Sequence, residues 1–368
     1  MQNKILAVGD IQICPKSYDQ IDKFLNEYLL DYITKNDIDT VIFPGDLFEY
    51  SNYTNNYVSS ASIIKPYSKF FDSLSWVNPK HLNNFGKKVT VIIVDGNHDK
   101  SYGSFANAND IFIAEHIIHS SKTIELYKPP SLTCGFILVP WLMPHEYTSR
   151  SEVLDYIKFL AFQCKSEGLI PILVGHLRVV DLESSIKIKK SDYSFTFSSE
   201  ELNSLGIEYG ILGDIHTKQN VVNKIDYIGC IRQRNFGEVN NPSVFRVITI
   251  TNQVITHDKY EVCNFFPEYH TLTVESEEAL EKLLEDNHFI DRDFYRIDAL
   301  FPTVTKSFRP NVIVRSTVKL ATKELSTPTR VQDLDASNLI KIYNDYTKEF
   351  DDLEKIMKYW NDTNDTTS

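Results

Sequence analysis

The residues of this chain that are best suited to chemistry lie in the turn Gly96-Asn97-His98-Asp99, directly after the apolar run 89–94. An amide oxygen beside an imidazole, at the end of a buried strand, is a combination that a metal-assisted phosphoester hydrolase would use. A Gly-Asn turn is also ordinary loop chemistry, because both residues tolerate positive φ. Taken alone, the turn leaves a structural and a catalytic interpretation open.

Four further predicted strands end in polar residues of the same kind. Strands 5–8, 39–44, 169–174 and 208–212 lead into Gly9-Asp10, Gly45-Asp46, Gly175-His176 and Gly213-Asp214-Ile215-His216. Apolar spacing predicts helices over 21–33 and 63–74, and strands alternating with helices are typical of an open α/β sheet. Ligands bind at the carboxyl ends of such strands, so we expect the five sites to meet at one edge.

Hydrolysis of a phosphodiester needs an activated water, neutralisation of the phosphoryl charge and a proton for the leaving alkoxide. Two divalent cations about 3.5–4 Å apart can supply the first two. Oxygen and imidazole donors suit Mn²⁺ or Mg²⁺, and no cysteine lies among the candidates. The five cysteines are scattered without a Cys-x-x-Cys spacing, so the sequence predicts neither disulfides nor a thiolate zinc site.

The length of 368 residues exceeds the roughly 250–300 at which one hydrophobic core stops growing, so we expect one large domain with smaller additions. No apolar run approaches the ~20 residues of a membrane span, and the first residues lead into a strand without a signal peptide. We therefore expect a cytoplasmic protein without membrane contact. The net charge of −12 argues against holding nucleic acid by the overall field.

Several basic residues could nevertheless contact DNA phosphates locally. Alternating apolar and basic residues over 186–190 fit a half-exposed strand, in which lysine also prevents aggregation, and the two interpretations stay open. The candidates for DNA contact are Arg178, Lys187, Lys189, Arg232 and Arg234.

Two smaller regions follow a predicted hairpin over 245–250 and 254–262. Strand 271–274, helix 277–284 and strands 294–300 and 312–320 predict a βαββ-like unit, and 326–329 resembles a linker. Beyond it, apolar residues spaced three and four apart predict an amphipathic helix, which would either fold back or lie in a partner's groove. These residues are Leu339, Tyr343, Tyr346, Phe350, Leu353, Met357 and Trp360.

The five glycine-led motifs together resemble those of the calcineurin-like metallophosphoesterases. Pro44-Gly45-Asp46-Leu47-Phe48, Val139-Pro140-Trp141, Tyr227-Ile228-Gly229 and Phe236-Gly237-Glu238 resemble the SbcD branch of that family. This branch includes the meiotic-recombination double-strand-break nucleases and the recombination nuclease subunits of large phages. The resemblance covers residues 4–250 by motif and the remainder by architecture.

The resemblance implies an α/β fold, a four-layer sandwich of two mixed sheets flanked by helices. It divides the chain into a nuclease domain (1–265), a small α+β capping domain (266–325) and a linker with a C-terminal helix (326–368) that binds a coiled-coil SMC-like ATPase. The implied activity is 3′ to 5′ exonuclease on duplex ends and endonuclease on single strands or hairpins. A homodimer within a heterotetramer would supply the DNA surface that this acidic chain lacks.

The resemblance also implies two divalent cations, for which we expect Mn²⁺, with Mg²⁺ as the alternative. One cation would take Asp10, Gln12, Asp46 and His216, and the other would take Asp46, Asn97, His176 and Asp214. Asp46 would bridge them. His98 would stand beside the scissile phosphate, stabilising it or protonating the leaving oxygen, and Asp99 would orient that imidazole.

Two of these positions depart from the family pattern, which has histidine in place of Gln12 and of Asp214. Aspartate is a competent ligand for hard cations, whereas Gln12 offers only a neutral amide oxygen. We therefore expect the cation nearest Gln12 to bind more loosely. Two alternatives remain: a phosphoesterase acting on small molecules or proteins, and a weakened subunit that serves mainly as a scaffold for its ATPase.

Overall fold

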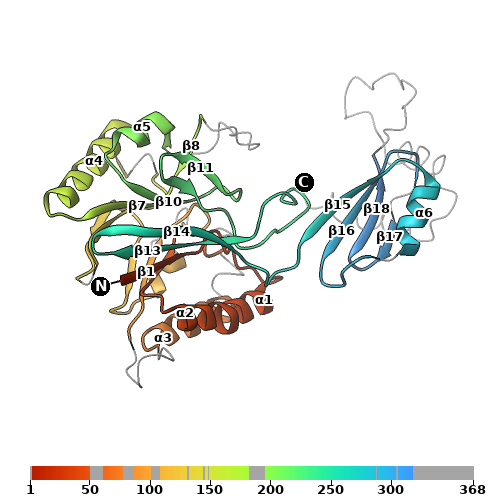
Figure 1. Cartoon of the computed structure of the whole chain (residues 1–368), viewed down its shortest axis with the longest axis horizontal. Coiled ribbons are helices and arrows are strands. Elements are labelled where there is room, and N and C mark those ends of the chain that lie inside the picture. The colour runs from red at the N-terminus through yellow and green to blue at the C-terminus, as the bar shows by residue number, and fades with distance from the viewer. Residues whose placement is uncertain are drawn as a thin grey trace, which may run out of the picture. The chain divides into compact units, whose positions relative to one another are not determined.

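The computed structural model of this chain describes most residues up to 317 (Figure 1). The described residues are 2–49, 61–77, 87–100, 108–130, 132–143, 146–147, 149–181, 195–286, 288–303 and 306–317. Lys187, Lys189 and the predicted ATPase-binding residues from Leu339 to Trp360 lie outside them.

The first sheet has six strands in the order β14-β13-β1-β2-β3-β4. Its parallel part comprises β1 (Gln2–Ala7), β2 (Thr40–Phe43), β3 (Thr90–Val94) and β4 (Ile117–Ser120). The hairpin of β13 (Val244–Thr251) and β14 (Val254–Val262) adds antiparallel to β1. Strands β2 and β3 are buried on both faces, which explains why their sequences are continuously apolar.

The second sheet also has six strands, in the order β11-β12-β10-β7-β6-β5. In chain order they are β5 (Glu125–Tyr127), β6 (Cys134–Val139), β7 (Ile170–His176), β10 (Tyr209–Gly213), β11 (Gln219–Val222) and β12 (Ile225–Tyr227). Strands β6, β7, β10 and β12 are parallel. A separate pair, β8 (Arg178–Val179) and β9 (Thr196–Phe197), follows β7.

Helices cover the outer face of each sheet (Figure 1). A continuous run of α1 (Tyr18–Lys23), a π-helical segment (Phe24–Leu29) and α2 (Leu30–Asn36), together with α3 (Ala61–Leu74), packs on the first sheet. Helices α4 (Arg150–Ser166) and α5 (Ser199–Ser204) pack on the second. A short 3-10 helix, Ala108–Ile111, precedes β4.

The inner faces of the two sheets pack against each other. Ile5 and Ile92 of the first sheet share one apolar cluster with Phe136 and Ile172 of the second. The order of layers is helix, sheet, sheet, helix, so the predicted four-layer sandwich is confirmed. The fully buried Arg246 of β13 also links the sheets, because its guanidinium donates to the Gly210 carbonyl of β10 at 2.8 Å.

A third sheet forms from the region after residue 268. It consists of β15 (Tyr269–Val274), β16 (Phe294–Ala299), β17 (Lys306–Arg309) and β18 (Val312–Ser316), in the order β15-β16-β18-β17, with α6 (Glu277–Asp286) packed on it. Residues including Val274, Leu280 and Ile297 give this sheet an apolar core of its own.

Four strands of the three sheets were not predicted from the sequence: β4, β11, β12 and β17. All are three or four residues long, and polar residues interrupt each of them, so no periodic signal marks them. The third sheet is consequently βαβββ rather than βαββ. None of the helices in the described part of the chain is both long and apolar enough to span a bilayer.

Candidate metal centre

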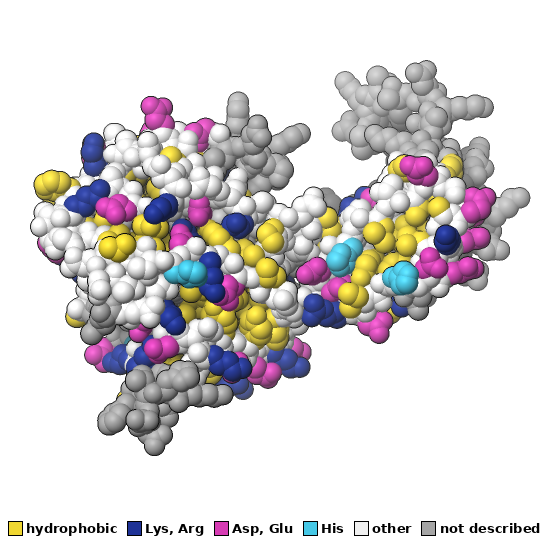
Figure 2. Space-filling model, in the orientation of Figure 1, with side chains coloured by type: hydrophobic (Ala, Val, Ile, Leu, Met, Phe, Trp, Pro, Cys, Tyr) yellow, Lys and Arg dark blue, Asp and Glu magenta, His cyan; other side chains and the backbone are white. Residues whose placement is uncertain are grey.

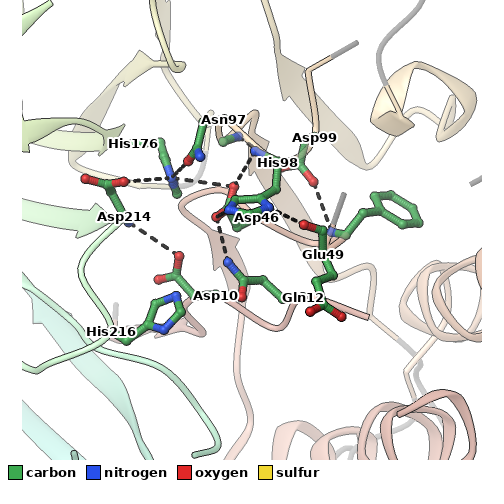
Figure 3. Close-up of polar contacts among 12 residues, drawn as sticks. Asp10, Gln12, Asp46, Glu49, Asn97, His98, Asp99, His176, Asp214 and His216 are labelled. Carbon is green, nitrogen blue, oxygen red and sulfur yellow. Dashed lines mark hydrogen bonds and ion pairs between the residues drawn. The ribbon is translucent and has the colours of Figure 1, made fainter. Parts of the chain in front are cut away.

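The five predicted strand ends meet at one place. Strands β1, β2 and β3 deliver residues from the first sheet, and β7 and β10 deliver residues from the second (Figure 3). Parallel strands within a sheet present their carboxyl ends at the same edge, and here the edges of two sheets face each other. The side chains brought together are Asp10, Asp46, Asn97, His176 and Asp214.

The backbone at this centre is strained. Asp10, Gln12, Asp46 and Asp214 have φ of 42°, 49°, 54° and 94°, which lie in the left-handed region that non-glycine residues rarely adopt. Such conformations cost on the order of 1–3 kcal/mol each and persist only where the surroundings enforce them. The strain turns these side chains away from the strand direction and toward the shared centre.

Asp46 lies at the middle of the cluster. Its Oδ1 accepts the backbone N–H of His98 at 3.0 Å, and its Oδ2 accepts the side-chain amide of Gln12 at 2.8 Å. A β-carbon on Gly96 would come within 2.0 Å of Asp46 Oδ1, so the glycine of this turn makes room for the carboxylate. Burial raises the pKa of Asp46, but attraction to His176 and His98 outweighs it, and the pKa is lowered.

His176 is fully buried against this carboxylate. Its Nδ1 lies 2.8 Å from the carbonyl oxygen of Pro44, which can only accept, so Nδ1 carries a proton. Its Nε2 faces three oxygens: Asn97 Oδ1 at 3.0 Å, Asp46 Oδ1 at 3.5 Å and Asp214 Oδ1 at 3.9 Å. Burial lowers the pKa of His176, yet the carboxylates of Asp46, Asp10 and Asp214 raise it to about 9.

Asp10 carries the clearest sign of a missing positive partner. Its Oδ2 is buried and accepts no hydrogen bond from any residue that the structure describes. Burial, opposed in part by His216 and His176, raises the pKa of Asp10 to about 6. Donor atoms of Asp10, Asp46 and His176 all lie within 4.8 Å of one another. Two carboxylates and an imidazole at that spacing fit a divalent cation.

Asp214 reaches the centre as half of an ion pair. Its carboxylate receives two hydrogen bonds from Arg178, at 3.1 and 3.0 Å, and the guanidinium lies 5.2 Å from the ring centroid of Trp141. Trp141 in turn contacts the imidazole of His176. Arg178 was predicted as a DNA contact, but the structure commits part of its guanidinium to Asp214.

Gln12 and His216 stand on the other side of Asp46 and share an arginine. The guanidinium of Arg234 donates to Gln12 Oε1 and lies 3.0 Å from His216 Nδ1. Glu238 accepts from the same guanidinium at 3.2 Å and lies 2.7 Å from His216 Nδ1. Burial raises the pKa of Glu238, but His216 and Arg234 bring it down to about 2.

His98 and Asp99 do not form the expected pair. The carboxylate of Asp99 is fully buried and accepts the backbone N–H groups of Gly96, at 2.9 Å, and Phe48, at 3.0 Å. The Nδ1 of His98 lies against the carbonyl oxygen of Glu49 instead. Asp99 therefore ties the β2 and β3 turns together, and a backbone carbonyl orients the imidazole. Burial, Asp46 and Asp95 raise the pKa of Asp99 to about 8.

Arg232 is also placed differently from the prediction. Its guanidinium donates to the carbonyl oxygens of Ile11, at 3.3 Å, and Gln12, at 2.9 Å, so it supports the first motif loop rather than facing DNA. Arg234, by contrast, lines the open cavity of the centre.

A cavity of about 330 Å³ opens over the cluster. Its wall includes Asp46, Asn97, His98, Asp214, His216 and Arg234. Glu238 also lines it, and the sequence had suggested no role for this residue, although it stands in a motif of the SbcD branch. No spacing rule links a carboxylate to an imidazole 22 residues earlier.

The fold and this cluster define an α/β protein with a candidate metal site, and comparison identifies the family. The family model described as calcineurin-like phosphoesterase matches residues 3–218. The chain belongs to this family.

Two curated relatives carry a name that makes them the SbcD component of the nuclease SbcCD. The protein from Staphylococcus epidermidis is 22% identical over 347 residues, 87% of this chain and 85% of that protein. The protein from Staphylococcus saprophyticus is 22% identical over 283 residues, 73% of this chain and 68% of that one. Among solved structures, a dimetal phosphatase from Danio rerio aligns with a TM-score of 0.44 and 11% identity, over 71% of this chain and 99% of that one.

The protonation of His176 makes a prediction about metal binding. Its Nε2 must lose a proton before it can hold a cation, and below a pKa of about 9 that proton is present. We expect the affinity for Mn²⁺ to rise about tenfold per pH unit from pH 6.5 to 8 and each binding event to release about one proton. Calorimetric titrations in two buffers of different ionisation enthalpy measure the proton count. An affinity independent of pH would contradict this account.

Proposed function

We propose that this chain is a metal-dependent DNA nuclease, the SbcD-like component of an SbcCD-like recombination and repair complex. The supporting observation is that three aspartates, His176 and Asn97 meet at the wall of the cavity that also holds the His98 imidazole. The family match and the names of the two relatives support the same class of reaction. The proposed reactions are 3′ to 5′ removal of nucleotides from duplex ends and endonucleolytic cleavage of single-stranded or hairpin DNA.

The donors that fit a cation are Asp10, Asp46, Asn97, His176 and Asp214. A bound Mn²⁺, or Mg²⁺ in its place, would supply charge to the phosphoryl oxygens and a more acidic water. The chain's own contribution is to orient this set, through the turn glycines and the Asp99 brace described above.

His98 is the residue that we propose to act on the leaving oxygen. Because Nδ1 faces the Glu49 carbonyl, the other nitrogen, Nε2, is the one turned toward Asp46, with 3.8 Å to Asp46 Oδ2. The side chain is 24% exposed and lines the cavity, so a substrate can reach it. As an imidazolium, His98 can hand its Nε2 proton to the departing alkoxide oxygen.

Attraction of DNA has to come from more than the surface of this chain. The net charge is −12, and basic and acidic side chains are interspersed on the face drawn in Figure 2. Phosphate contacts dominate the affinity of DNA-binding proteins. We therefore include in the proposal a cytoplasmic assembly of two copies of this chain with an SMC-like ATPase that contributes DNA-binding surface.

Replacing His98 tests the nuclease proposal. His98→Ala should reduce Mn²⁺-dependent degradation of end-labelled duplex DNA by about 10² to 10⁴-fold, because it removes the proton donor. Mn²⁺ affinity should stay unchanged, since His98 is not among the proposed ligands. The exposed His257 on β14 offers a matched control, and His257→Ala should leave cleavage unaltered.

Two results would count against the proposal. Equal cleavage by the native chain and His98→Ala would remove His98 from the mechanism. Hydrolysis of p-nitrophenyl phosphate without any cleavage of DNA would indicate the phosphatase alternative.

The proposed ATPase-binding segment rests on its apolar spacing from Leu339 to Trp360 and on the relatives' names, because it lies outside the described residues. All four apolar clusters of the described residues end before residue 316. We therefore expect deletion of 330–368 to leave a folded protein, with a melting temperature within a few degrees of the full chain.

The truncated chain should no longer co-purify with the SMC-like ATPase of the same genome, and its Mn²⁺ affinity should be retained. Loss of folding would instead indicate that the segment packs on its own domain. Retained co-purification would show that the ATPase binds elsewhere.

A further inference from the structure

The two halves of the centre differ in how well they fit a cation. On the Asp10, His176 and Asn97 side, oxygen and nitrogen donors converge, and one buried carboxylate oxygen has no partner among the described residues. On the Gln12 and His216 side, the donors are already engaged. The Gln12 amide nitrogen donates to Asp46, and its oxygen accepts from Arg234.

The guanidinium of Arg234 contacts both residues that set this second side apart. It donates to Gln12 Oε1 and lies 3.0 Å from His216 Nδ1, while Glu238 holds it from behind at 3.2–3.3 Å. A permanently charged group in this position repels a divalent cation at short range. The neutral amide of Gln12 offers no charge to offset that repulsion, unlike a carboxylate.

The arginine on the first side acts differently. Arg178 pairs with Asp214, and the pair is electrically neutral, as a histidine ligand would be. The Asp214 carboxylate can accept from Arg178 and still offer lone pairs to a cation. Arg178 therefore offsets a charge, whereas Arg234 adds one.

We propose that this chain binds one divalent cation per centre and that the Arg234 guanidinium takes the place of the other, supplying positive charge to the phosphoryl group of the substrate. Arg234 lines the cavity beside Asp46 and His98, and its contacts with Gln12, His216 and Glu238 leave N–H groups to spare among the five of a guanidinium. A planar guanidinium is well suited to phosphate oxygens. The role toward phosphate rests on the proposed function, but the number of cations does not.

Metal stoichiometry tests the inference directly. Purified full-length chain, dialysed against micromolar Mn²⁺ and analysed by atomic emission, should hold one Mn²⁺. Its electron paramagnetic resonance spectrum should be that of isolated ions rather than an exchange-coupled pair. The double variant Q12H/R234A, which restores an imidazole and removes the guanidinium, should hold two and give the coupled spectrum.

Control variants separate this effect from general damage. Arg150→Ala removes an exposed arginine that pairs with Glu201, outside the cavity-lining set, and should still hold one Mn²⁺. Asp46→Asn should hold none. Inorganic phosphate, titrated into the Mn²⁺-loaded chain, should bind about tenfold more weakly to Arg234→Ala than to the native chain or Arg150→Ala.

Two Mn²⁺ ions with a coupled spectrum in the native chain, or none, would overturn the inference. So would phosphate binding that is indifferent to Arg234→Ala. If the double variant does not fold, as judged by its thermal transition, the spectrum of the native chain still decides the number of ions. Cleavage of DNA by a chain with two ions would refute this inference and leave the nuclease proposal intact. One ion without DNA cleavage would do the reverse.

Discussion

Three carboxylates, of Asp10, Asp46 and Asp214, are buried around one imidazole, and much of the fold serves to hold them there. Like charges at this spacing in a low-dielectric interior repel one another strongly unless a cation compensates them. The protonated His176 provides one positive charge, and Arg178 provides another through Asp214. The carboxylate oxygen of Asp10 that accepts no hydrogen bond from the described residues marks where compensation is incomplete.

The two-sheet sandwich makes this concentration of charge possible. Residues such as Ile5 and Phe136 join the sheets through a dry apolar layer, which fixes the strand ends rigidly relative to each other. The strained turns then aim the side chains inward, and Asp99 links two of these turns through backbone N–H groups. Stability in the layers thus offsets strain and charge at the edge.

The layer order and the meeting of the five strand ends could be predicted from the sequence, because apolar runs followed by Gly-Asp or Gly-His turns report parallel strands and their carboxyl ends. The partners of those side chains could not be predicted in the same way. Arg234, Glu238 and the Glu49 carbonyl reach the centre from loops, and their contacts depend on packing between segments far apart in the chain. The same reason explains the misplacement of Asp99 and Arg232, whose residue types fit several roles and whose neighbours decide among them.

These contacts change how the two departures from the family pattern are understood. Gln12 and Asp214 first suggested a weakened centre. In the structure each is paired with an arginine, so the substitution and its neighbour form a consistent electrostatic arrangement rather than a simple loss.

The central claim is that the Asp46 cluster holds a divalent cation. Anomalous diffraction at the manganese absorption edge, from crystals of the full chain grown with Mn²⁺, measures this directly. We expect an anomalous peak within bonding distance of Asp46, Asn97 and His176. A map without a peak at these residues, from protein saturated with Mn²⁺, would contradict the account.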